Sequence, residues 1–184
     1  SYFAGSDGLD IEGLGRKNME QLVRVGLVKD LPDIFRLRAE DLAGLEGWGE
    51  KSADNAVQAI RTAARTTLAR FIRALGIRHV GEVNATLLAS HFGTLARIMA
   101  ATVDELVLVE GIGQQAATSL VEYFRDPQVQ EMLARLFAAG LEIIPEETSS
   151  QYLEGRVFLF TGTLSALSRG EAKQRVKALG GQVV

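Results

Sequence analysis

Four short turns, recurring about every 32 residues, limit most strongly how this chain can fold. The turns are Gly13-Leu14-Gly15, Gly47-Trp48-Gly49, His79-Val80-Gly81 and Gly111-Ile112-Gly113, and their last glycines are separated by 34, 32 and 32 residues. Apolar residues repeat in register with them, two residues before each turn and four, seven and eight residues after it. The last three offsets fall on one face of an α-helix. Each repeat is therefore predicted to be a helix, a tight turn and a second helix.

Helix boundaries between the turns can also be predicted. Three glycines follow amphipathic stretches and suit the left-handed residue that ends a helix: Gly26, Gly93 and Gly140. Thr102 and Glu105 have the spacing of a capping box, and Asp126-Pro127 places proline in the first turn of a helix that runs to about Ala139. The chain is thus predicted to be a compact, all-helical array through residue 140.

Each turn also offers a binding site for an anion. Glycine reaches positive φ without steric cost and lets another backbone approach closely. The helix that follows begins with N–H groups that have no acceptor in the helix and carry the positive end of its dipole. A phosphate oxygen is the natural ligand, and this kind of binding needs no contact with a base. Phosphate binding is therefore predicted at Gly13, Gly15, Gly47, Gly49, His79, Gly81, Gly111 and Gly113.

A tight connection between helices is the alternative interpretation of these turns. It is the better one for a single turn, whereas four in register favour phosphate binding. Lys17 and Lys51 lie two residues after their turns, where an ammonium can reach a phosphate, and Arg78 adds charge before the third turn. His79 replaces a glycine, so its ring itself would have to contact the phosphate. The fourth turn has no basic neighbour, which leaves a structural role open, and Trp48 is expected to pack in the core or against the turn.

The distribution of charge is more informative than its total of −3. Five arginines fall in one stretch without an acid, namely Arg61, Arg65, Arg70, Arg73 and Arg78, whereas residues 104–126 are acidic. One face can therefore be basic on a mildly acidic molecule. The absence of cysteine excludes disulfides and thiol-ligated metals, and no apolar run is long enough to span a membrane. The first residues resemble neither a start nor a signal peptide, which indicates a chain that begins within a longer protein.

The C-terminal part has a different pattern. Residues 145–152 have the composition of a linker. Residues 153–184 contain a strand-like run at 156–160, a turn at Thr161-Gly162-Thr163, a helix that Ser168 and Glu171 would cap, and a second strand from Gln182. This β-α-β opening is too short to bury a normal core. We expect it to be weakly ordered, to pack on another part, or to continue in a longer chain.

Several stretches resemble one known family. Asp10-Ile11-Glu12-Gly13-Leu14-Gly15, Gly49-Glu50-Lys51-Ser52-Ala53 and Ala74-Leu75-Gly76-Ile77-Arg78-His79-Val80-Gly81 resemble the domain of four helix-hairpin-helix (HhH) motifs in bacterial NAD⁺-dependent DNA ligases. The resemblance spans residues 1–144. From Leu153 the chain resembles the start of the BRCT domain that follows in that family, with residues 155–164 and Gly180-Gly181 as matching pieces. The implied fold is mainly α, a compact array of four HhH motifs followed by a truncated α/β segment.

The resemblance implies a function for a longer protein. Ligases of this family seal nicks during DNA replication and repair. They transfer adenylate from NAD⁺ to a lysine in a Lys-x-Asp-Gly motif and then to the 5′-phosphate, before attack by the 3′-hydroxyl releases AMP. The full-length enzyme also has a divalent metal and a zinc module. No lysine of this chain fits that motif, so no catalytic residue, metal ligand or cofactor is expected here. For this chain, the resemblance implies contact with the backbone of nicked duplex DNA. It also implies that the remaining ligase domains are partners and that the protein acts in the bacterial cytoplasm, at the nucleoid. Thr161 and Gly162 would form a phosphate site in the BRCT-like part.

Two alternatives stay open. HhH modules also occur in other DNA repair proteins, including glycosylases with a catalytic aspartate; Asp126-Pro127 is the only candidate for that role, and a helix start explains it better. The second alternative is a protein-interaction scaffold, because the fourth repeat and the linker are acidic.

Overall fold

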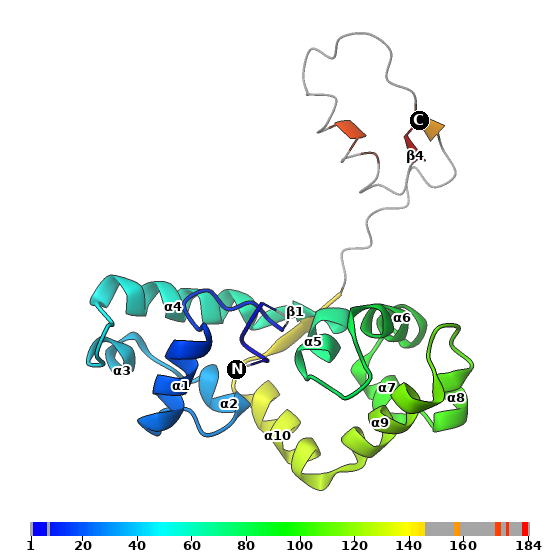
Figure 1. Cartoon of the computed structure of the whole chain (residues 1–184), viewed down its shortest axis with the longest axis horizontal. Coiled ribbons are helices and arrows are strands. Elements are labelled where there is room, and N and C mark those ends of the chain that lie inside the picture. The colour runs from blue at the N-terminus through cyan, green and yellow to red at the C-terminus, as the bar shows by residue number, and fades with distance from the viewer. Residues whose placement is uncertain are drawn as a thin grey trace. The chain divides into compact units, whose positions relative to one another are not determined.

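The computed structural model describes residues 2–6, 8–145, 157–158, 172–173, 176 and 182–183. They fall into two units, Ser1–Ile144 and Pro145–Val184. The first unit contains α1 (Arg16–Arg24), α2 (Leu31–Ile34), α3 (Ala39–Ala43), α4 (Glu50–Ala63), α5 (Leu68–Ala74), α6 (Glu82–Phe92), α7 (Leu95–Ala100), α8 (Val103–Val107), α9 (Gln114–Arg125) and α10 (Pro127–Ala138), with strands β1 (Arg65–Thr67) and β2 (Glu142–Ile144). In Figure 1, α1–α4 lie on one side of this unit and α6–α9 on the other.

The predicted helix ends are confirmed. Three glycines adopt left-handed φ angles as expected: Gly26 (79°), Gly93 (73°) and Gly140 (109°). The Asp126 carboxylate accepts a hydrogen bond from the Gln128 amide at 2.8 Å, which caps α10. At α8, the Glu105 amide donates to Thr102 Oγ1 at 3.3 Å, and the Thr102 amide donates back to the Glu105 carboxylate at 2.8 Å. The bond from the Thr102 amide, with that from its hydroxyl, holds the pKa of Glu105 below its ordinary value.

The first repeat departs from the expected pattern. Helices α3, α5 and α8 precede the second, third and fourth turns, but the described residues before Gly13 contain no helix. They form a tight loop, in which a Cβ on Gly8 would lie 2.3 Å from the Phe3 carbonyl oxygen. Asp10 also has a left-handed φ of 51°. The prediction of a helix before the first turn is therefore wrong, because this loop bends the backbone in ways that a helix does not allow.

A short parallel strand pair is the second departure from the all-helical prediction. Arg65, Thr66 and Thr67 of β1 lie opposite Glu142, Ile143 and Ile144 of β2, respectively. The two adjacent threonines favour an extended backbone between α4 and α5, and their partner comes from the end of the unit. The strands therefore join the middle of the chain to the segment that follows α10.

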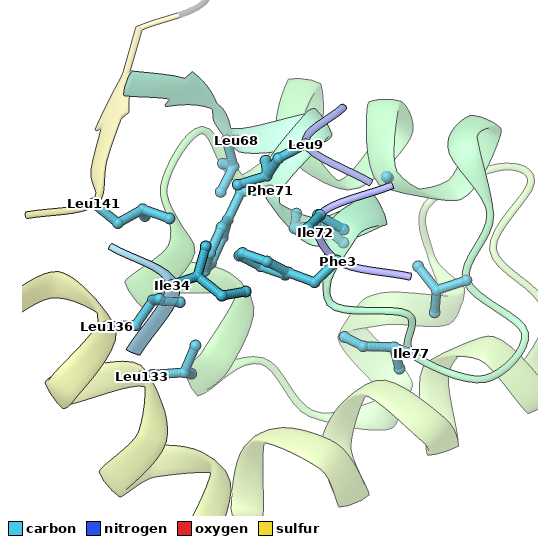
Figure 2. Close-up of a cluster of buried hydrophobic side chains, with 14 of the residues drawn as sticks. Phe3, Leu9, Ile34, Leu68, Phe71, Ile72, Ile77, Leu133, Leu136 and Leu141 are labelled. Atoms are coloured by element: carbon cyan, nitrogen blue, oxygen red, sulfur yellow. The ribbon is translucent and has the colours of Figure 1, made fainter. Parts of the chain in front are cut away.

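The core of the first unit is built from segments that are distant in sequence. Figure 2 shows Phe71 and Ile72 of α5 beside Phe3 of the N-terminal loop and Ile34 of α2, with Leu136 of α10 close by. Phe71, Ile72 and Leu136 are completely buried. An ion pair between Arg135 of α10 and Asp30 at the start of α2 joins the same elements. The N-terminal loop, α2, α5 and α10 are therefore held by one shared core.

The second unit has the predicted β-α-β order at its described residues. β3 (Val157–Phe158) pairs in parallel with β4 (Gln182–Val183). Ala172 and Val176, which lie between them in sequence, are helical and buried. Thr161 and Gly162, together with Ser168, Glu171 and the linker after Pro145, lie outside the described residues.

Candidate nucleic-acid interface

The four turns share one backbone conformation. Their first residues are all left-handed, with φ of 84° at Gly13, 82° at Gly47, 63° at His79 and 94° at Gly111. The middle amide of each turn donates to the carbonyl three residues earlier, at 3.0 to 3.1 Å, and the carbonyl of each last glycine accepts the first hydrogen bond of the next helix, at 2.9 to 3.0 Å. The repeat that was found in the sequence is therefore a structural repeat.

The middle residue of each turn points into the protein. Leu14, Val80 and Ile112 are 1%, 5% and 5% exposed. Trp48 is half-buried, and its Nε1 donates to the Gln21 side-chain oxygen at 2.9 Å. The expectation that Trp48 packs within the fold is thus confirmed. With these side chains anchored inward, the main chain of each turn lies at the surface.

Neither the backbone angle nor the packing requires glycine at the last position of each turn. Its φ is −62° at Gly15, −106° at Gly49, −94° at Gly81 and −80° at Gly113, values that any residue adopts. Apart from its own chain neighbours, a Cβ built at any of the four would meet no atom of the described residues within 4 Å. Positive φ therefore explains only the first residue of each turn. The space beside the last glycine stays open to an external molecule.

The helices that follow the four turns differ from others in the unit in how their first residues are capped. Helices α5, α7, α8 and α10 begin at Thr67, Thr94, Thr102 and Asp126, whose side chains each accept a hydrogen bond from the helix. Helices α1, α4, α6 and α9 begin at the four turn glycines without a side-chain cap. The four helices that follow the turns therefore offer uncapped N–H groups to an acceptor from outside.

The predicted basic side chains divide into two groups. Lys17 and Lys51 are exposed at the second residue of α1 and α4, and Arg78 and His79 are exposed at the third turn. Three other arginines are held by the protein: Arg65 by Glu142 (3.3 Å), Arg73 by Glu82 (3.3 Å) and Arg70 by the Leu9 carbonyl (2.9 Å). The expected five-arginine basic face is therefore smaller than predicted, because partners outside the acid-free stretch engage these three.

Two asparagines that the sequence analysis did not select support the turns. Asn18 Nδ2 donates to the Gly13 carbonyl at 2.7 Å, and Asn84 Nδ2 donates to the His79 carbonyl at 2.9 Å. Both lie three residues after the last turn glycine. That shared register was the signal that could have identified them.

Comparison with known proteins agrees with the repeat. A model described as a SAM-like helix-hairpin-helix tandem matches residues 7–62, and one described as a helix-hairpin-helix motif matches residues 70–133. Over 99% of its length, the chain is 47% identical to a DNA ligase of Alkalilimnicola ehrlichii and 44% identical to one of Trichlorobacter lovleyi. The chain belongs to the DNA ligase family. It spans 28% and 27% of these two ligases, just over a quarter of their length.

Each of the two matched regions of this DNA ligase segment contains two of the four turns. The turns at 13–15 and 47–49 form the first pair, and those at 79–81 and 111–113 form the second. In the first pair, a Cβ on Gly13 would lie 3.3 Å from the Ala56 Cβ of α4. In the second pair, a Cβ on Gly111 would lie 2.7 Å from Leu87 Cδ1 of α6. Within each pair, one turn thus packs against the helix that follows the other turn. Among the described residues of this segment, no helix is long and apolar enough to cross a membrane, and no three His, Asp or Glu side chains gather as metal ligands.

Proposed function

We propose that this chain binds duplex DNA through its sugar-phosphate backbone, without sequence preference, as the DNA-gripping part of a DNA ligase. The open last glycines carry the proposal: Gly15, Gly49, Gly81 and Gly113 have ordinary φ and unobstructed space where a side chain would stand. A phosphate that approaches the main chain there accepts hydrogen bonds from uncapped helix amides. Binding to amides also suits a protein with a net charge of −3, because it needs few cations.

The proposal extends to the longer protein. There the chain would hold nicked DNA, while an NAD⁺-dependent adenylation site, with its divalent metal and a zinc module, lies in other ligase domains. The relatives are named DNA ligases and are much longer than this chain, and no lysine here has the Lys-x-Asp-Gly context. This chain alone would then bind DNA without sealing it. Thr161 and Gly162 remain a proposed phosphate site of the BRCT-like part.

A salt titration tests the proposal. We expect the chain to bind labelled nicked and intact duplexes of unrelated sequence with dissociation constants of order 10⁻⁴ to 10⁻⁶ M near physiological salt. Lys17→Ala and Lys51→Ala should each make the slope of log K against log salt shallower by about 0.9, because each removes one phosphate contact. Fluorescence anisotropy at several salt concentrations measures both. Absence of binding at low salt would contradict the proposal and favour a protein scaffold.

A separate test addresses His79. His79 holds a left-handed φ of 63°, which costs a non-glycine residue about 1 kcal/mol or more. Such strain at an exposed turn suggests a use for the side chain. We expect His79→Gly to raise the free energy of unfolding by about 1 kcal/mol and yet to weaken DNA binding, because the imidazole is lost while the turn is kept. Urea unfolding and anisotropy measure the two effects. An unchanged or tighter DNA affinity would exclude the ring as a contact.

A further inference from the structure

The two pairs of turns carry different side chains at the same position relative to the turn. The second residue after each last turn glycine is Lys17, Lys51, Val83 and Gln115. All four are exposed. Because the four turns share one backbone conformation, the side chains at this register leave their helices in the same direction relative to the turn. The first pair therefore places ammonium groups where the second pair places an apolar and a neutral side chain.

Val83 has no partner in the core that accounts for it. The side chains of α6 that are buried are Ala85, Leu88, Ala89 and Phe92, whereas Val83 is 70% exposed. Leu108, three residues before Gly111, is 82% exposed. These two are the most exposed large apolar side chains among the described residues, and both flank turns of the second pair. Single exposed apolar residues are common, but their coincidence with the two turns is specific.

The α6 surface connects Val83 to the fourth turn. Leu87 follows Val83 by one helical turn on the same face, and its Cδ1 is the atom that a Cβ on Gly111 would meet at 2.7 Å. Leu87 is itself only half-buried. Apolar side chains of α6 therefore extend from the helix start after Gly81 to the fourth turn at Gly111.

We infer that Val83 and Leu108 contact the apolar carbons of deoxyribose, so that the second pair holds the sugars of the strand whose phosphates meet its turns. The inference rests on the proposed function. Duplex DNA presents sugar carbons between successive phosphates, so a side chain beside a bound phosphate reaches a sugar without crossing a base. The first pair then binds by amides and ammonium groups, whereas the second binds by amides and apolar contact. Salt weakens the contribution of the ammonium groups to binding and leaves the contribution of the apolar contacts unchanged.

The inference is tested by anisotropy with the full 184-residue chain and a labelled nicked duplex, over a range of salt concentrations. Val83→Ser and Leu108→Ser are each expected to weaken binding about three- to tenfold, as loss of about one to two buried CH₂ groups does, with an unchanged salt slope. Val83→Lys should instead steepen the slope by about 0.9, because it restores the lysine of the first pair at this register. Val23→Ser, at a 56% exposed valine near the end of α1, is the matched control and should leave binding unchanged.

The outcomes separate the inference from the proposed function. If the unaltered chain binds DNA but both serine variants bind equally well, the sugar contact is wrong and the backbone-binding function stands. A serine variant that weakens binding and flattens the salt slope also overturns the inference, because the lost contact would then be electrostatic. If the unaltered chain does not bind the duplex at any salt concentration, the proposed function itself fails. Thermal unfolding of each variant confirms that the compared proteins are folded.

Discussion

Replacing the last glycine of a turn with valine is expected to lower DNA affinity about tenfold or more while the protein stays folded. Gly49→Val and Gly81→Val place a branched side chain in open space, because no atom of the described residues other than chain neighbours lies within 4 Å of either Cβ position. The same side chain would obstruct a phosphate approaching the helix amides. Hydrogen bonds to a charged group are worth about 1.5 to 3 kcal/mol each, so loss of one is a tenfold effect or larger. Anisotropy at fixed salt concentration gives the affinity.

Stability separates this effect from damage to the fold. Gly49 and Gly81 have φ of −106° and −94°, so valine should lower the free energy of unfolding by only about 1 kcal/mol, the difference between good and poor N-cap residues. Ala134→Val, on the exposed side of α10, is a control outside the turns. We expect no effect on DNA binding there. Capture of phosphate by the main chain would be contradicted if Lys51→Ala abolished binding while both glycine variants bound normally.

Phe71→Ala is expected to lower the free energy of unfolding by about 3 to 5 kcal/mol, the usual range for a buried phenylalanine. Phe71 is completely buried in α5, and its ring lies 5.7 Å from that of Phe137 on α10. Figure 2 shows it among side chains from the N-terminal loop, α2 and α10. Truncation leaves a cavity where these segments meet. Urea unfolding measures the loss, and both pairs of turns should unfold in one transition because they share this core.

Phe137→Ala is the matched comparison. Phe137 contacts the same ring but is 36% exposed, so less apolar surface returns to water and solvent can enter the space. A smaller loss is therefore expected. If Phe137→Ala destabilised the protein as much as Phe71→Ala, the shared core would not be centred on α5. If the two pairs unfolded in separate transitions with Phe71 intact, the pairs would be independent.

The parts of the site that depend on local sequence were predictable. A left-handed φ somewhere in each turn that carries two glycines follows from the residue type, and burial of Met19 and Leu22 follows from helical periodicity. The capping box of Thr102 and Glu105 likewise needs only neighbouring residues. Each of these features is determined within a few residues, and four copies reinforced the pattern.

Other features depended on residues that meet only in the folded protein. Arg65 and Arg73 lie in a stretch without acids, yet Glu142 and Glu82 pair with them, so a local count of charge overstated the basic surface. The sequence could not distinguish a glycine needed for positive φ, such as Gly47, from one such as Gly49 that leaves open space. The distinction needed both the backbone angles and the surrounding atoms.

The pairing of β1 with β2 also constrains how the protein forms during synthesis. Thr66 of β1 pairs with Ile143 of β2, which is synthesised after all four turns. A nascent chain that already contains both pairs of turns therefore still has an unpaired strand edge. Leu141, which is 4% exposed in the finished fold, is also missing until then. Long-range closure of this kind is slow and comes late. The first unit can therefore reach its native packing only after the ribosome has released residue 144, and chains that stall earlier should be substrates for chaperones and proteases.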